Sequence, residues 1–219
     1  MTILRFLSLP VTAALVALGV WVTGGWLSND FRVSMVLTGV WFAIAAAACV
    51  AVAWHVRPLR VPVLLGYALS AAAIGIYLGL TTVRDRVVDE RVVSAAPVTA
   101  APAADKRPPA RPVEQHRARF RSHEHETTGI AAVVRLPDGR RFATLTGFET
   151  SPGPDLRVRL VPGDSVSGNA EASVDLGPLK GNRGDQQYKI PAGVRVSGRT
   201  LLIWCRAFSA PFGSAHLAG

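Results

Sequence analysis

The chain divides near residue 83 into an apolar part and a part in which apolar and polar residues alternate. Three uncharged apolar stretches fill the first part, at residues 6–27, 33–54 and 61–81. Each matches the roughly 20 residues that a helix needs to cross the hydrocarbon of a bilayer. Apolar runs of this length are rare in soluble domains. Residues 1–83 are therefore predicted to form three transmembrane helices of a multi-pass membrane protein.

The part of the chain that follows begins with an Ala/Pro-rich segment. Seven Ala and five Pro occupy residues 94–113. Proline fixes φ and removes a backbone donor, and the segment has no apolar periodicity. This composition predicts an extended linker, which we place at residues 84–116.

From residue 117 onward, short β-type runs alternate with turn signals. Asp138-Gly139 is a hairpin signal, because a tight turn demands positive φ. Residues 201–205 are apolar at every position, which predicts a central strand buried on both faces. Residues 117–219 are predicted to be an all-β domain, a sandwich or barrel of about eight short strands. The candidate strands are 117–122, 129–136, 140–148, 156–161, 171–176, 186–190, 200–206 and 210–217.

The arginines near the predicted helices indicate an orientation. The start of the chain and the second short loop carry Arg5, Arg57 and Arg60, whereas the first loop carries Arg32 alone. Positive residues are enriched in cytoplasmic loops. The pattern predicts a cytoplasmic amino terminus and a C-terminal domain outside the cytoplasm. A weakly basic start without a small-residue cleavage site favours a retained first helix over a cleaved signal peptide.

The charge and composition also exclude several functions. The formal net charge is +9, but the basic residues form no cluster with aromatic residues, so no nucleic-acid partner is predicted. The apolar stretches contain no internal charged residue of the kind that ion transport requires. They also lack an internal histidine, so haem is not expected within this chain. The helices are best interpreted as an anchor.

Two cysteines, Cys49 and Cys205, are the only ones in the sequence. Cys49 falls inside the second predicted helix, and Cys205 falls in a predicted strand outside the membrane. A single thiol in an oxidising compartment has three reactive options, namely oxidation, metal binding and intermolecular pairing. The competing interpretation is a small apolar residue buried in a core strand. Both interpretations remain open at this point.

Four motifs in the C-terminal half resemble the DM13 domain family. They occur in the family's order, and the resemblance extends from about Phe120 to Leu217. It implies an extracellular or membrane-tethered domain, often combined with redox modules, with a proposed redox or electron-transfer role. The motifs are SHEHETTG (122–129), LTGFETSPGPDLRVRLV (145–161), VDLGPLKGNRGDQQYKIP (174–191) and LLIWCRAFSAPFGSAHL (201–217).

The resemblance assigns roles to particular residues. It implies that Cys205, in the IWC motif, is the redox-active residue, with Trp204 beside it. His125, Asp155 and Tyr188 match further positions of the family pattern and are candidate supporting residues. His216 lies where the family does not usually place a histidine.

A metal site is a second possibility for the same residues. One cysteine with one or two histidines suits copper or iron. If residues 123–125 are extended, the imidazoles of His123 and His125 lie on one face. Histidines among glutamates are also typical of a solvated edge, so Cys205, His125 and His123 are only candidate ligands.

These observations leave two functional hypotheses. The first is a membrane-anchored, extracytoplasmic DM13 protein with a redox or electron-transfer role centred on Cys205. The second is a non-catalytic interaction module or an accessory subunit of a membrane complex, with an envelope or respiratory protein as partner. The sequence contains no G-x-S-x-G, H-E-x-x-H, P-loop or C-x-x-C motif, so a classical enzyme is not predicted.

Overall fold

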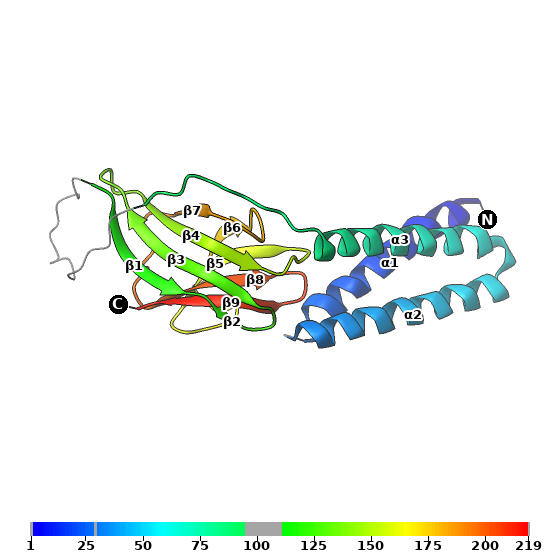
Figure 1. Cartoon of the computed structure of the whole chain (residues 1–219). Helices are drawn as coiled ribbons and strands as arrows, with labels where there is room; N and C mark the ends of the chain where they lie inside the picture. The colour runs from blue at the N-terminus through cyan, green and yellow to red at the C-terminus, as the bar shows by residue number, and fades with distance from the viewer. Residues whose placement is uncertain (1, 29, 95–110, 219) are drawn as a thin grey trace. The chain divides into compact units, whose positions relative to one another are not determined.

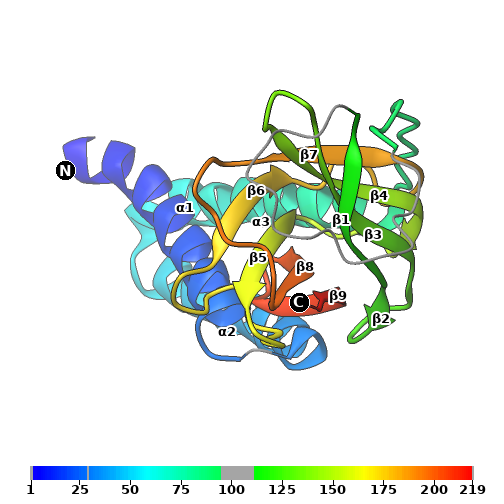
Figure 2. The same cartoon turned by 90° about the vertical axis from the view of Figure 1, so that its left-hand side faces the viewer.

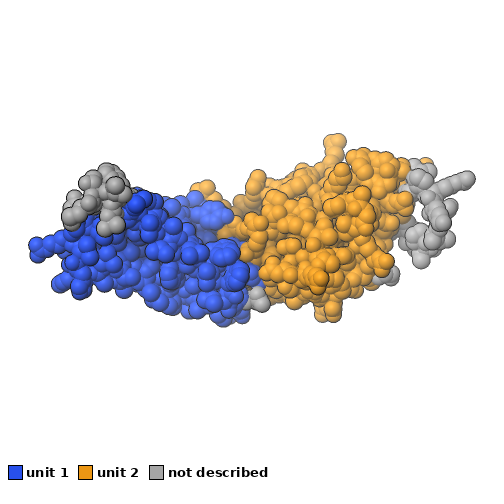
Figure 3. Space-filling view, turned by 180° about the vertical axis from the view of Figure 1, so that it is seen from behind, with its two compact units in different colours: residues 1–82, 207–209 blue, residues 83–206, 210–219 orange. Residues whose placement is uncertain are grey.

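The computed structural model describes residues 2–28, 30–94 and 111–218, with side chains from residue 7 onward. The chain forms two compact units, shown in different colours in Figure 3. Residues 1–82 and 207–209 belong to the first, and residues 83–206 and 210–219 to the second. The first unit is helical. The second unit is called the β-domain below, because all of its regular elements are strands.

Three long helices make up the first unit. They are α1 (Thr2–Gly25), α2 (Phe31–His55) and α3 (Arg60–Val83), and a 3-10 turn, η1 (Arg57–Leu59), precedes α3. Asp30 caps the start of α2, because its Oδ1 accepts a hydrogen bond of 2.9 Å from the Val33 N–H. All three helices are long and apolar enough to cross a membrane. The predicted helical part of the chain is therefore confirmed.

The helices contact one another through small residues and a few interhelical hydrogen bonds. The Trp41 indole lies where a Cβ on Gly19 would be, and its Nε1 donates to the Val16 carbonyl over 3.2 Å. The hydroxyls of Thr23 and Thr38 lie 3.3 Å apart. Close approach at glycine and paired hydroxyls are typical of helices that pack in an apolar medium.

The β-domain is a sandwich of two antiparallel sheets, one with strand order β1-β3-β4-β7 and the other with order β2-β9-β8-β5-β6 (Figure 1). Figure 2 separates the four strands of the first sheet from β8 and β9 of the second. The strands are β1 (Val113–Arg119), β2 (Arg121–Ser122), β3 (Thr127–Arg135), β4 (Arg141–Thr150), β5 (Leu156–Pro162), β6 (Val174–Pro178), β7 (Gln186–Ile190), β8 (Arg199–Cys205) and β9 (Ala210–Leu217).

One strand predicted at residues 117–122 is in fact two. β1 pairs with β3 in the first sheet, whereas β2 pairs with β9 in the second. The chain changes sheets at Phe120, whose buried ring packs edge-on against Phe148 with centroids 5.2 Å apart. The sequence pattern did not show this change, because it depends on which strand lies beside each half.

Two local predictions are confirmed. The Asp138-Gly139 turn joins β3 to β4, with Gly139 at φ +84° and a hydrogen bond of 2.8 Å from Leu136 N to Arg140 O. Leu201–Cys205 are all buried, as predicted for a strand covered on both faces. β8 lies between β5 and β9, and this central place gives it neighbours on both edges.

The segment predicted as a linker is partly ordered against the β-domain. Residues 83–94 lie in the same compact unit as the strands, and β1 begins at Val113, before the predicted domain start at residue 117. Val88 N donates to Arg183 O over 2.9 Å, and Glu90 N donates to Asp185 O over 2.9 Å. The Ala/Pro-rich residues 95–110 lie outside the described residues.

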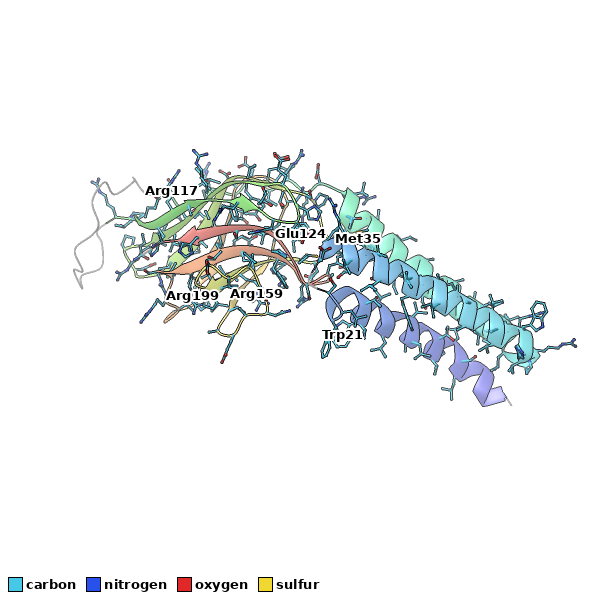
Figure 4. The ribbon with its side chains drawn as sticks, turned by 90° about the horizontal axis from the view of Figure 1, so that it is seen from below. Trp21, Met35, Arg117, Glu124, Arg159 and Arg199 are labelled. Atoms are coloured by element: carbon cyan, nitrogen blue, oxygen red, sulfur yellow. The ribbon has the colours of Figure 1, made fainter. Side chains whose placement is uncertain are left out.

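The loop between β5 and β6 covers the outer face of the second sheet. Trp204, Leu202 and Val161 form a buried cluster on this face, and Gly168 of the loop packs directly on the Trp204 ring. Two arginines labelled in Figure 4 fix the end of the loop. Arg199 donates to the Ala172 carbonyl over 2.8 Å, and Arg159 donates to Ser173 Oγ over 3.0 Å.

Candidate functional site

The four motifs meet at one end of the sandwich, which we call the loop end. Four connections form it: the bend between β2 and β3, the connection from β4 to β5, the loop from β6 to β7, and the β8–β9 hairpin. Antiparallel pairing of β3 with β4, β5 with β8 and β8 with β9 brings these connections to the same edge. The family pattern is therefore a spatial cluster as well as a sequence of motifs.

Cys205 is the last residue of β8 and ends the strand at the loop end. It has no exposed surface, and it pairs in register with Leu156 of β5 and Ala210 of β9. Alternation along β8 places Cys205 on the same face as Ile203 and Leu201, and Trp204 on the opposite face. The two neighbouring motif residues thus lie on different sides of the second sheet.

Asp155 binds Arg206, the residue that follows Cys205 in the chain. The Arg206 N–H donates to the Asp155 carbonyl over 2.9 Å, and Arg206 Nε lies 2.7 Å from Asp155 Oδ2. This pair joins the β4–β5 connection to the end of β8. Asp155 is therefore engaged by an arginine, and its structural effect on Cys205 is to fix the strand end that carries it.

The two candidate histidines lie in the bend between β2 and β3 and not in a strand. The backbone N–H groups of His123 and Glu124 donate to the carbonyls of Phe212 and Pro211, which fastens the bend to β9; Glu124 is labelled in Figure 4. The His125 ring packs on Phe212 with centroids 4.0 Å apart.

His123 has a different neighbour from that of His125. Its Nε2 lies 2.8 Å from Ser214 Oγ. Desolvation, with a smaller effect of the nearby Arg121 charge, lowers the pKa of His123 below its ordinary value. The ring is therefore neutral at physiological pH and suited to hydrogen bonding with a hydroxyl.

Thr127, at the start of β3, connects three of the motifs. Its Oγ1 lies 2.8 Å from Thr150 Oγ1 and donates to the Phe212 carbonyl over 3.1 Å. Gly213 allows this contact, because a Cβ there would lie 2.5 Å from the Thr127 Cβ. Thr127 and Gly213 are thus required by the close approach of the two sheets.

Tyr188 belongs to a buried polar network in the first sheet. Its hydroxyl donates to Gln186 Oε1 over 2.7 Å and accepts from the Lys180 N–H over 3.0 Å. Desolvation by burial is the largest cause of a pKa raised well above the ordinary value of 10.0. The phenol therefore stays protonated and acts as a donor.

Sequence reasoning missed the partners of Tyr188. Gln186 has no exposed surface, and its Oε1 also accepts from the N–H groups of Lys180 and Gly181. Lys180 Nζ lies 2.7 and 2.8 Å from the two carboxylate oxygens of Glu90 and 5.2 Å from the centre of the Tyr188 ring. The available signal in the sequence was the glutamine two positions before Tyr188. Nothing in the sequence pointed to Glu90.

Metal binding gains no support from the arrangement of ligands. Among the residues that the structure describes, no three His, Cys, Asp or Glu side chains are grouped to hold a metal ion. The loop end has a hollow of about 300 Å³ with Asp85, Glu126 and Glu149 on its walls. Arg183 bridges Asp85 and Glu149, at 3.6 and 2.8 Å, and so neutralises part of this charge.

Comparison with known proteins identifies the domain. Residues 119–217 match the family model described as Electron transfer DM13. The match covers the four motifs, agrees with the resemblance seen in the sequence, and is consistent with a DM13 domain-containing protein. No curated protein and no solved structure matches the chain.

Proposed function

We propose that this chain is a membrane-anchored DM13 protein with a redox or electron-transfer role, in which Cys205 is the redox-active residue. The observation that carries the proposal is the match of residues 119–217 to a family described by electron transfer. Cys205 occupies the cysteine position of the family's IWC motif, and it lies where the motif connections meet. The three apolar helices support the anchoring role.

The burial of Cys205 constrains how such a role operates. Thiol–disulfide exchange requires one sulfur to reach another, and Cys205 has no exposed surface. Reaction with a disulfide therefore requires the β8–β9 hairpin to open locally at the loop end. The Arg206–Asp155 pair beside the cysteine opposes this opening.

The proposal predicts that Cys205 reacts while the β-domain remains folded. The full chain in detergent is incubated with glutathione disulfide, and the bound glutathione is mapped by mass spectrometry. The Cys205 thiolate attacks one sulfur, a protein–glutathione disulfide forms, and reduced glutathione leaves. We expect modification in the wild type and in Cys49→Ser, and none at this site in Cys205→Ser.

Cys49→Ser is the matched control, because Cys49 is the other cysteine of the chain. Metal content of the same samples is measured, and metal lost only in Cys205→Ser would assign a metal-bound form of the redox centre. A wild-type protein without metal, whose Cys205 reacts only at denaturant concentrations that unfold the β-domain, contradicts the proposal.

A second function is favoured by a specific observation. Cys205 is fully buried between β5 and β9, in the position of a core residue. A buried thiol in an apolar layer behaves as a small apolar side chain. The β-domain is then a non-catalytic module that binds an envelope or respiratory protein. An unreactive Cys205 in the glutathione experiment supports this function.

We also propose that the β-domain lies outside the cytoplasm. The support is the arginine distribution, since Arg57 lies between α2 and α3 and Arg60 begins α3, whereas Arg32 alone lies near the start of α2. In a background without cysteines, Ser167→Cys on the exposed β5–β6 loop should react with an impermeant maleimide on sealed spheroplasts. His55→Cys, at the end of α2, should react only after lysis. The reverse pattern overturns this orientation.

A further inference from the structure

Residues 85–93, which we call the strap, follow α3 and run along the β6–β7 loop and the start of β7. The strap makes strand-like hydrogen bonds there. Val88 N donates to Arg183 O, and Arg183 N donates to Arg86 O over 3.3 Å, which is a parallel bridge. The bridge continues with Glu90 N to Asp185 O. The strap lies outside the segment matched by the family model.

Side chains of the β6–β7 loop and of β7 also bind the strap. Asn182 accepts from the Arg86 N–H over 2.6 Å and donates to Asp85 Oδ1 over 2.8 Å. Gln187 Oε1 accepts from the Val93 N–H over 2.9 Å. The buried Asn182 also donates to the Thr150 carbonyl, so it connects the strap to the end of β4.

The strap also makes an ion pair, between Glu90 and Lys180, with an N–O distance of 2.7 Å. Both carboxylate oxygens accept from Lys180 Nζ, and Oε2 also accepts from the Gln187 N–H over 3.1 Å. Desolvation raises the pKa of Glu90, but the hydrogen bonds from Lys180 and Gln187 and the Lys180 charge outweigh it, so the pKa is lowered. Multiple charge-assisted bonds to one carboxylate are selective for an acidic residue at this position.

Two glycines let the backbone of the strap come close. A Cβ on Gly181 would meet the Val88 side chain at 2.7 Å, and a Cβ on Gly184 would meet the Val88 carbonyl carbon at 3.0 Å. Gly184 also has φ +96°, which favours glycine. The GNRG sequence at 181–184 is therefore the surface on which the strap lies.

We propose that residues 180–187 form a peptide-binding edge of the DM13 domain for an extended segment that carries an acidic side chain at one position, and that the strap is its occupant in this chain. Lys180 binds the acidic side chain of the segment. Asn182, Gln187 and the loop carbonyls bind its backbone. Addition of a strand to a sheet edge is a general mode of peptide recognition. Because the strap of the same chain occupies this edge, strands of other molecules cannot pair with it.

The test cuts the covalent connection and asks whether the strap still holds the domain. A site for a specific protease is inserted within residues 95–110 of the full chain, which is immobilised in detergent by an amino-terminal tag. After cleavage, the 111–219 fragment should stay on the resin with the wild-type strap. Glu90→Lys should raise its rate of release by about tenfold or more, because several charge-assisted hydrogen bonds are lost.

Asp89→Lys is the matched control, because it makes the same charge change at an exposed neighbouring position. It should leave the retention unchanged. Lys180→Glu added to Glu90→Lys restores the ion pair and should restore retention, which a misfolded variant would not do. The 111–219 fragment released from Glu90→Lys keeps an unchanged binding edge. It should therefore bind a synthetic peptide of residues 84–94 and not a scrambled version of that peptide.

Release of the wild-type fragment after cleavage overturns the proposal. Equal retention of Glu90→Lys and wild type also overturns it, since the strap contact is then not what holds the fragment. Release of Glu90→Lys without recovery in the double variant and without binding of the 84–94 peptide has the same consequence, because the edge then lacks the proposed selectivity.

Discussion

Replacing Trp204 with alanine is expected to lower the free energy of unfolding of the β-domain by about 3–5 kcal/mol. Trp204 is only 2% exposed and is among the largest fully buried side chains of the described chain. Its ring lies between Leu202, Val161 and the backbone of Gly168. Truncation removes these contacts and leaves a cavity under the β5–β6 loop.

Trp204→Phe is the matched variant and should cost clearly less than Trp204→Ala, because phenylalanine keeps most of the ring and leaves a smaller cavity. The Trp204 indole N–H is buried without a hydrogen-bond partner, so its removal leaves no acceptor unsatisfied. Stability is measured on the full chain in detergent, by pulse proteolysis in urea and by hydrogen exchange of the β8 amides. A loss in Trp204→Phe equal to that in Trp204→Ala would contradict the prediction, because phenylalanine keeps most of the ring volume that alanine removes.

Gln186→Leu is expected to destabilise the β-domain by a similar amount, about 3–5 kcal/mol, because each buried group left unsatisfied costs about 1–3 kcal/mol. Gln186 Nε2 donates to the Gly181 carbonyl over 2.9 Å, and Oε1 accepts from the Tyr188 hydroxyl and the Gly181 N–H. Leucine has nearly the same size but satisfies none of these groups. The same urea and hydrogen-exchange measurements apply.

Gln115→Leu makes the same substitution at an exposed position of β1. It should change the stability by no more than about 0.5 kcal/mol. If Gln186→Leu is equally neutral, the hydrogen bonds of Gln186 are not a source of stability. Because Gln186 orders the β6–β7 loop, the variant should also increase hydrogen exchange in residues 180–185, next to the strap.

Short-range patterns in the sequence predicted several features that the structure confirms. The three helices follow from the length of uncharged stretches, since burial in an apolar medium leaves the backbone no other partners. The Asp138-Gly139 turn follows from the φ that the turn needs, and the burial of Leu201–Cys205 follows from an unbroken apolar run. These features depend on neighbouring residues alone.

The candidate site was predictable only in part. The motifs pointed to Cys205, Asp155 and Tyr188, but not to the contacts that hold them. Arg206 engages Asp155 across two connections, and the partners of Tyr188 include a lysine that binds Glu90, some 90 positions earlier in the chain. Such contacts arise from loop closure over long sequence separations, which periodicity does not encode.

The sequence by itself determined the division into apolar helices and an all-β domain, and the DM13 character of that domain. Only the tertiary structure decided that residues 84–94 are ordered along the β-domain and that the four motifs meet at one end of the sandwich. Hydrophobic patterning depends on each residue and its near neighbours. The meeting of the motifs and the binding of the strap depend instead on which distant strands and loops lie side by side.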